Sequence, residues 1–74
     1  MLVSHIAVAI KERRKQLGIT QPHLAELAQV SVNTLCKLER GQGNPSLAVL
    51  NKLAMVLGMA LKLEVILPST QQQK

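Results

Sequence analysis

The residues best suited to chemistry lie on one face of a helix that the sequence predicts from Val32 to about Arg40, after a serine cap. This face carries Asn33, Cys36, Lys37 and Arg40, with Val32 at its N-terminal edge. An asparagine can pair with adenine, a lysine can reach the acceptors of guanine, and a valine can contact the methyl group of thymine. Val32, Asn33, Cys36 and Lys37 could therefore read base edges in the major groove of DNA. An ordinary amphipathic surface helix would show the same pattern, so this face alone does not decide the function.

Polar residues around this predicted reading helix could hold the DNA backbone. Gln21 opens the preceding helix, where its amide and the N-terminal N–H groups could meet a phosphate. Arg40 ends the reading helix, and Gln42 and Asn44 follow in the loop Gly41–Asn44, whose backbone amides could reach the same strand. We expect these residues to bind phosphates, because positioning contacts that flank a reading helix are what a groove-binding domain needs.

Two charged residues fall on apolar faces and predict an internal ion pair. Arg14 lies four residues after Ile10 on the apolar stripe of the first helix, and Glu39 lies four residues after Leu35 on the apolar face of the reading helix. A buried charge that loses its partner destabilises a protein by roughly 3–5 kcal/mol. We therefore expect Arg14 and Glu39 to pair, and we do not count Arg14 among the DNA contacts.

Helical periodicity and capping residues predict the elements that position these side chains. The predicted helices run from Ser4 as a cap to about Leu17, over Gln21–Ala28, from Val32 to about Arg40, and over Leu47–Leu57. The residues suited to begin the later helices are Thr20, Ser31 and Ser46, and those suited to end helices are Gly18 and Gly58. The second and third helices, joined by a short turn, form a helix-turn-helix pattern.

The segment Met59–Leu67 alternates in hydropathy with a period of two, which predicts a strand. A lone strand leaves its edge unpaired, and the simplest solution is antiparallel pairing with the same strand of a second copy. The residues that we expect to form this homodimer contact are Leu61, Leu63, Val65 and Leu67. Such a dimer would set two reading helices about one helical turn of DNA apart, or ~34 Å. The expected organisation is a DNA-binding domain over 1–58, a dimerisation strand over 59–67 and a flexible tail over 68–74; truncation after Gly58 should then give monomers.

Composition narrows the classes of function. A chain of 74 residues has room for one domain, and its net charge of +5 fits a phosphate-bearing partner as well as an ordinary basic surface. The absence of Phe, Tyr and Trp argues against modules that stack single-stranded bases. With no Asp, no phosphate loop and no metal-ligand spacing, we expect no enzyme, no cofactor and no metal. The single cysteine, Cys36, and a longest apolar run of only Leu53–Leu61 lead us to expect a cytoplasmic protein without a membrane segment.

Residues 4–59 resemble the helix-turn-helix domain of the Cro/phage-repressor (XRE) family. The motifs that carry the resemblance are Thr20-Gln21, Leu24-Ala25, Val30-Ser31, Leu38-Glu39-Arg40-Gly41 and Pro45-Ser46-Leu47. The resemblance implies a compact, four-helix, lambda-repressor-like domain, here all-α with a C-terminal strand. It also implies base reading by Val32, Asn33 and Lys37, a phosphate contact by Gln21 and an internal salt bridge between Arg14 and Glu39. One departure is Gln29, which stands where the family usually has glycine. It must then adopt a left-handed conformation at some cost, or the turn differs slightly from that of the family.

The order of fourth helix, strand and short tail is similar to HipB-like antitoxins, which repress their own operon and bind a HipA-like kinase toxin. This resemblance implies an autoregulatory repressor on a palindromic operator in double-stranded DNA, with such a toxin as a further partner. A stand-alone repressor and a restriction–modification controller protein are the alternatives within the family. An alternative of another class is a protein-interaction module that neutralises a partner without reading DNA. The salt dependence of binding distinguishes a DNA-binding repressor from a protein-interaction module, because binding through phosphates weakens steeply as the salt concentration rises.

Overall fold

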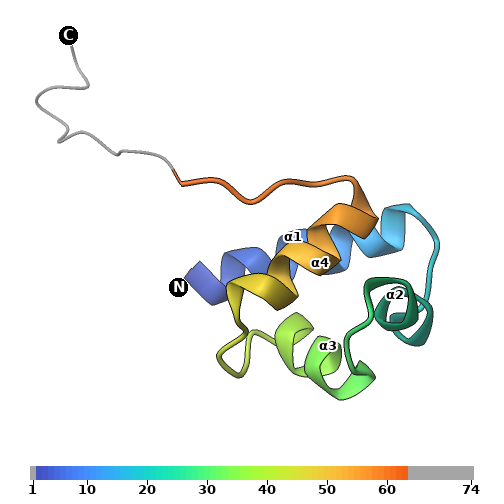
Figure 1. The fold of residues 1–74 in the computed structure, drawn as a ribbon, viewed down its shortest axis with the longest axis horizontal. Coiled ribbons are helices and arrows are strands. Elements are labelled where there is room, and N and C mark those ends of the chain that lie inside the picture. The colour runs from blue at the N-terminus through green and yellow to red at the C-terminus, as the bar shows by residue number, and fades with distance from the viewer. Residues whose placement is uncertain (1, 64–74) are drawn as a thin grey trace, which may run out of the picture.

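The domain is an assembly of helices, seen in a computed structural model that describes residues 2–63 (Figure 1). The helices are α1 Leu2–Gln16, α2 Gln21–Ala28, α3 Val32–Glu39 and α4 Leu47–Leu57. Helix α2 packs against α3 and α4, and α1 packs against α3 and α4, so every helix contributes to one interior. The predicted four-helix fold of the helix-turn-helix type is confirmed.

Serine and threonine caps begin three of the helices, as their sequence predicts. The hydroxyl oxygens of Thr20, Ser31 and Ser46 each accept a hydrogen bond from the backbone N–H three residues further on, at 3.2, 3.0 and 3.1 Å. Such a bond satisfies one of the N–H groups that a helix start leaves without a partner, and is worth about 1 kcal/mol. The starts of α2, α3 and α4 are thereby fixed by local chemistry.

The start of α1 differs from the expectation. This helix begins at Leu2, so Ser4 lies inside its first turn and the prediction that Ser4 caps it is wrong. Ser4 lies against Gly41 in the loop between α3 and α4. It is therefore a first-turn residue that contacts a neighbouring loop, and not the cap of its own helix.

The turn between α2 and α3 passes through Gln29, which adopts the left-handed conformation with φ 59° and ψ 43°. Among the described residues it is the only one other than glycine with a positive φ. Its backbone N–H bonds to carbonyls at the end of α2, as in a glycine-terminated helix. The non-glycine residue therefore keeps the turn of the family at a cost in backbone strain of roughly 1–2 kcal/mol.

Leucines build the core in place of aromatic residues. The largest fully buried side chains are Leu24 from α2, Leu35 and Leu38 from α3, and Leu53 and Leu57 from α4. They cluster with Ile10 of α1 and the small residues of α2. Because α3 places both of its leucines in this cluster, its opposite face is held at the surface of the domain.

The predicted C-terminal strand is not shown. Met59–Leu63 belongs to no helix or strand, while residues 64–67 of the predicted strand and the predicted tail lie outside the described residues. A strand is defined by backbone hydrogen bonds to a second strand, and residues 2–63 of this single chain contain none to pair with. Figure 1 shows residues 59–63 running back along α4, on the side of the domain away from α3. None of the described helices is long and apolar enough to span a bilayer.

Candidate nucleic-acid interface

The outward face of α3 carries polar side chains that the rest of the domain does not use. Asn33, Lys37 and Arg40 are exposed, and Val32 at the start of the helix is 41% exposed. Within residues 2–63, the side chains of Asn33, Lys37 and Arg40 make no hydrogen bond or ion pair. The arrangement leaves their donors and acceptors available to a partner outside the domain.

The inward face of α3 anchors the helix through an ion pair with α1. Arg14 Nε lies 2.7 Å from Glu39 Oε2, and Arg14 Nη2 lies 2.9 Å from Glu39 Oε1. Arg14 Nη1 also donates to the backbone carbonyl of Ile19 at 2.9 Å. The Glu39 side chain is only 2% exposed. The structure therefore brings Arg14 and Glu39 together as a bidentate pair in the interior.

The charges around Glu39 keep its carboxylate ionised despite burial. Burial alone would raise the pKa of Glu39, but hydrogen bonds from Arg14 and Gln21, with the charges of Arg14 and Lys11, outweigh it and lower the pKa below its ordinary value. In return, the hydrogen bond to Glu39 raises the pKa of Arg14 against the opposing effect of burial. Both members of the pair are charged at neutral pH.

Gln21 and Cys36, expected to bind a phosphate and to read a base, contact each other. The Cys36 Sγ–H donates to Gln21 Oε1 at 3.1 Å, and Gln21 Nε2 donates to Glu39 Oε1 at 2.9 Å. Both side chains are half-buried at the junction of α2 and α3. Sequence reasoning missed this contact, because a pattern along each helix does not show which side chains meet between helices.

The loop after α3 uses backbone amides that were expected to face DNA. The N–H of Gly41 donates to the carbonyl of Leu38, and the N–H of Gln42 donates to the carbonyl of Lys37, both at 2.9 Å. These bonds end α3, so these two amides are already used within the domain, and the phosphate contact expected of the loop stays a prediction. The side chains of Gln42 and Asn44 are exposed and remain candidates for that contact.

A basic cluster of Lys11, Arg13, Arg14 and Lys15 lies in the second half of α1, and two of its members contact other parts of the domain. Arg13 Nε donates to the carbonyl of Leu57 at the end of α4, at 2.9 Å, and Arg14 binds Glu39. Lys11 and Lys15, by contrast, are exposed. Arg13 and Arg14 are thus committed to contacts within the domain.

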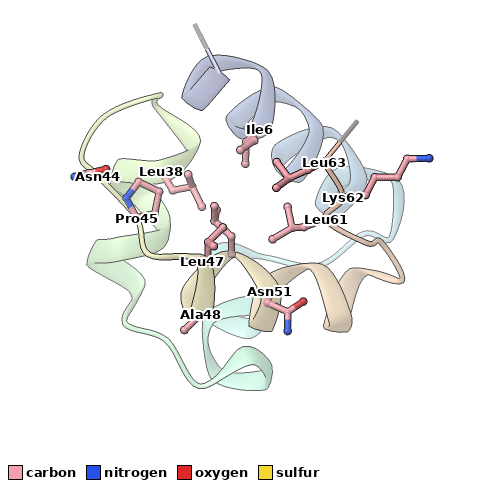
Figure 2. Close-up of a pocket in the computed structure, with 11 residues that line it drawn as sticks. Ile6, Leu38, Asn44, Pro45, Leu47, Ala48, Asn51, Leu61, Lys62 and Leu63 are labelled. Carbon is pink, nitrogen blue, oxygen red and sulfur yellow. The ribbon is translucent and has the colours of Figure 1, made fainter. Parts of the chain in front are cut away.

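A second candidate surface lies on the side of the domain where the described chain ends. An open apolar groove of about 820 Å³ runs between α1, the start of α4 and residues 61–63, and its lining includes Ile6, Leu47, Leu61 and Leu63. Figure 2 shows Leu61 and Leu63 facing toward Ile6, while Lys62 between them points away. Leu61 is 39% exposed and Leu63 is fully exposed. Two of the predicted dimerisation residues thus line an apolar surface that is open to solvent.

The part of the chain that the structure describes contains no candidate metal-binding site. Across residues 2–63, no group of three His, Cys, Asp or Glu side chains could hold a metal ion. The hydrogen bonds among Arg14, Glu39, Gln21 and Cys36 join α1, α2 and α3 to one another.

The family of the chain follows from comparison with known proteins. A helix-turn-helix family model matches residues 10–63, which is more than half of the chain and includes α2 and α3. The chain therefore belongs to the helix-turn-helix family of the Cro/phage-repressor (XRE) type, whose members are DNA-binding transcription regulators. The family predicted from the sequence is confirmed, whereas the resemblance to HipB-like antitoxins stays a prediction.

Curated relatives carry names of the same kind. An uncharacterized HTH-type transcriptional regulator of Methanothermobacter thermautotrophicus is 45% identical over 49 residues, which cover 66% of this chain and 71% of the relative. An uncharacterized HTH-type transcriptional regulator of Haemophilus influenzae is 42% identical over 64 residues, covering 81% of this chain and 65% of the relative. The HTH-type transcriptional regulator DdrOP3 of Deinococcus deserti is 40% identical over 52 residues, covering 70% of this chain and 40% of the relative.

Proposed function

We propose that this chain is a sequence-specific repressor that binds a palindromic operator in double-stranded DNA as a homodimer in the cytoplasm. The observation that carries the proposal is the outward face of α3. There, Asn33, Lys37 and Arg40 are exposed and make no bond to residues 2–63. One face of α3 buries two leucines and the Glu39 member of the ion pair. The hydrogen-bonding groups of Asn33, Lys37 and Arg40 on the other face have no partner within residues 2–63, so they are available to a ligand. DNA base edges match them, since an amide pairs with adenine and an ammonium with guanine.

The first experiment is fluorescence anisotropy with labelled duplex DNA from directly upstream of the chain's own gene, across a salt series, beside a scrambled duplex. We expect tight, sequence-selective binding whose affinity falls as salt rises, because counterions leave the phosphates on binding. Asn33→Ala and Lys37→Ala should each weaken binding by roughly 5- to 150-fold, the discrimination that a good base contact supplies.

Lys52→Ala is the matched control for Lys37→Ala. Lys52 is exposed on α4 and loses the same charge when replaced, but it lies outside the outward face of α3. Equal losses from the two variants would contradict base reading by α3. Binding that is indifferent to sequence, or that does not change with salt, would favour the protein-interaction module instead.

The occupant that we propose for the apolar groove is a second copy of the chain. Leu61 and Leu63 lie on it where the described chain ends, and the sequence continues with Val65 and Leu67 at the same period of two. Extended segments that pair about a two-fold axis satisfy each other's backbone groups and cover each other's apolar side chains. Such a dimer predicts a palindromic operator, because two copies of α3 would then meet two half-sites.

The dimer is tested with Leu63→Asp. Since Leu63 is fully exposed in the single chain, this change should leave the folded domain intact and convert the dimer to a monomer in sedimentation equilibrium. Met55→Asp is the matched control, because Met55 is 71% exposed on α4 but does not line the groove. A Leu63→Asp variant that dimerises as well as the wild type would contradict the assignment.

The antitoxin role rests on the resemblance to HipB-like antitoxins and adds a HipA-like kinase toxin as a partner. It is tested by co-purification of the tagged chain with the product of the neighbouring gene. Repression of its own promoter without such a partner would place the chain among stand-alone repressors or restriction–modification controller proteins.

A further inference from the structure

The amide of Gln21 is held between two groups of opposite hydrogen-bonding character. On one side the Cys36 thiol lies 3.1 Å from Oε1, and on the other the Glu39 carboxylate lies 2.9 Å from Nε2. Glu39 is itself fixed by its bidentate pair with Arg14. The contacts form a chain from α1 through α3 to the first residue of α2 and back to α3.

This environment allows the amide only one orientation. An ionised carboxylate can only accept hydrogen bonds, so it requires the NH2 end of the amide, and the thiol hydrogen then meets the carbonyl end. Turning the amide by 180° would set Oε1 of Gln21 against Oε1 of Glu39 and lose both bonds. In the orientation observed, Nε2 uses one N–H on Glu39, and its second N–H has no partner within residues 2–63.

We propose that Cys36 is a positioning residue for DNA binding, which holds the Gln21 amide so that the second N–H of Nε2 meets a phosphate. The inference rests on the proposed DNA-binding function and revises the expected role of Cys36, which acts through Gln21 and does not read a base. In this role the half-buried thiol contributes to the affinity for DNA as a hydrogen-bond donor. It neither acts as a nucleophile nor becomes oxidised. Without the thiol, the carbonyl end of the amide loses its donor, and the side chain gains freedom that binding must remove.

The experiment uses a short duplex recovered from a random pool by selection with the wild-type chain. Affinities for this duplex are compared for the wild type, Cys36→Ala, Cys36→Ser, Gln21→Ala and the double variant Cys36→Ala/Gln21→Ala. We expect Cys36→Ala to weaken binding by about three- to tenfold, the size of one modest hydrogen bond. Cys36→Ser keeps a donor and should bind within about twofold of the wild type. Cys36→Ala should have no further effect once Gln21 is alanine, because the two residues act as one unit.

A readout at single phosphates separates positioning from a general structural effect. Neutral methylphosphonates are placed one at a time along the duplex, and the wild type should lose affinity at the phosphate that Gln21 contacts. Gln21→Ala and Cys36→Ala should both be insensitive at that phosphate while keeping the wild-type response at the others.

Three results are decisive against the proposal. They are additive effects of Cys36→Ala and Gln21→Ala, an unchanged methylphosphonate profile in Cys36→Ala, and wild-type affinity of Cys36→Ala. Thermal unfolding followed by circular dichroism is recorded for each variant, so that a loss of folded protein is corrected for. If selection with the wild type enriches no duplex, the proposed DNA-binding function itself fails. By contrast, a duplex that binds the wild type tightly but shows no loss of affinity for Cys36→Ala contradicts only the role proposed for Cys36.

Discussion

Replacement of Arg14 by methionine removes one partner of the interior ion pair while keeping a long apolar stem in its place. The wild-type guanidinium makes two short hydrogen bonds to Glu39, at 2.7 and 2.9 Å, and one to the carbonyl of Ile19. In the variant, the Glu39 carboxylate stays almost fully buried and keeps only the bond from Gln21. Leaving a buried charge without its partner is expected to lower the free energy of unfolding by roughly 3–5 kcal/mol.

This loss is large for a domain of this size. At about 0.05–0.15 kcal/mol per residue, a chain of 74 residues unfolds with a free energy of about 4–11 kcal/mol. Arg14→Met should therefore unfold at a much lower urea concentration, or be largely unfolded without urea. The chain has no Phe, Tyr or Trp, so far-ultraviolet circular dichroism is the suitable probe. Protein concentration is kept constant, since dimerisation would couple to unfolding.

The variant should also respond to pH in the opposite sense from the wild type. In the wild type, the pKa of Glu39 is lowered, so the stability that the pair contributes is present above the ordinary pKa of a glutamate and is lost only as the pH falls through the lowered value. In Arg14→Met, the uncompensated carboxylate is destabilising, and protonation relieves it. The difference in stability between the two proteins should therefore shrink between pH 7 and about 4.

A further replacement, Glu39→Leu on the Arg14→Met background, tests the cause. Because the buried charge is then gone, it should restore a substantial part of the lost stability. If Arg14→Met unfolds at the same urea concentration as the wild type, or if the double variant is no better than the single one, the argument from an unpaired buried charge is refuted.

Two further predictions concern backbone conformation and helix ends. Gln29→Gly should raise the free energy of unfolding by about 0.5–1 kcal/mol, because glycine adopts the left-handed φ of 59° without strain, and a lower urea midpoint would contradict this. Arg13→Ala should lower the free energy of unfolding by about 1–2 kcal/mol, because it removes the bond from Nε to the carbonyl of Leu57. Its control is Lys15→Ala, an exposed cation on the same helix, which should stay within about 0.5 kcal/mol of the wild type; equal losses would point to charge rather than to the bond.

The helices and their order could be predicted from local patterns along the chain. The signals for them act over a few residues and can therefore be recognised in the sequence. They are the three capping hydroxyls, the periodicity of the leucines and the glycines at helix ends. The same is true of the outward face of α3, since the helical repeat alone separates Asn33 and Lys37 from Leu35 and Leu38. The left-handed conformation of Gln29 is one of the two outcomes that the family pattern left open, and the structure selects it.

Which side chains are already engaged within the domain is seen only in the packed structure. Cys36 meets Gln21 across the junction of α2 and α3, so two side chains that were expected to contact DNA contact each other. Arg13 reaches the end of α4 from α1. The packed structure likewise shows an open apolar groove beside Leu61 and Leu63. The physical reason is the range of the interactions: a cap or a helical stripe joins residues near in sequence, whereas these contacts join residues 15 and 44 positions apart, which only the packed helices bring together.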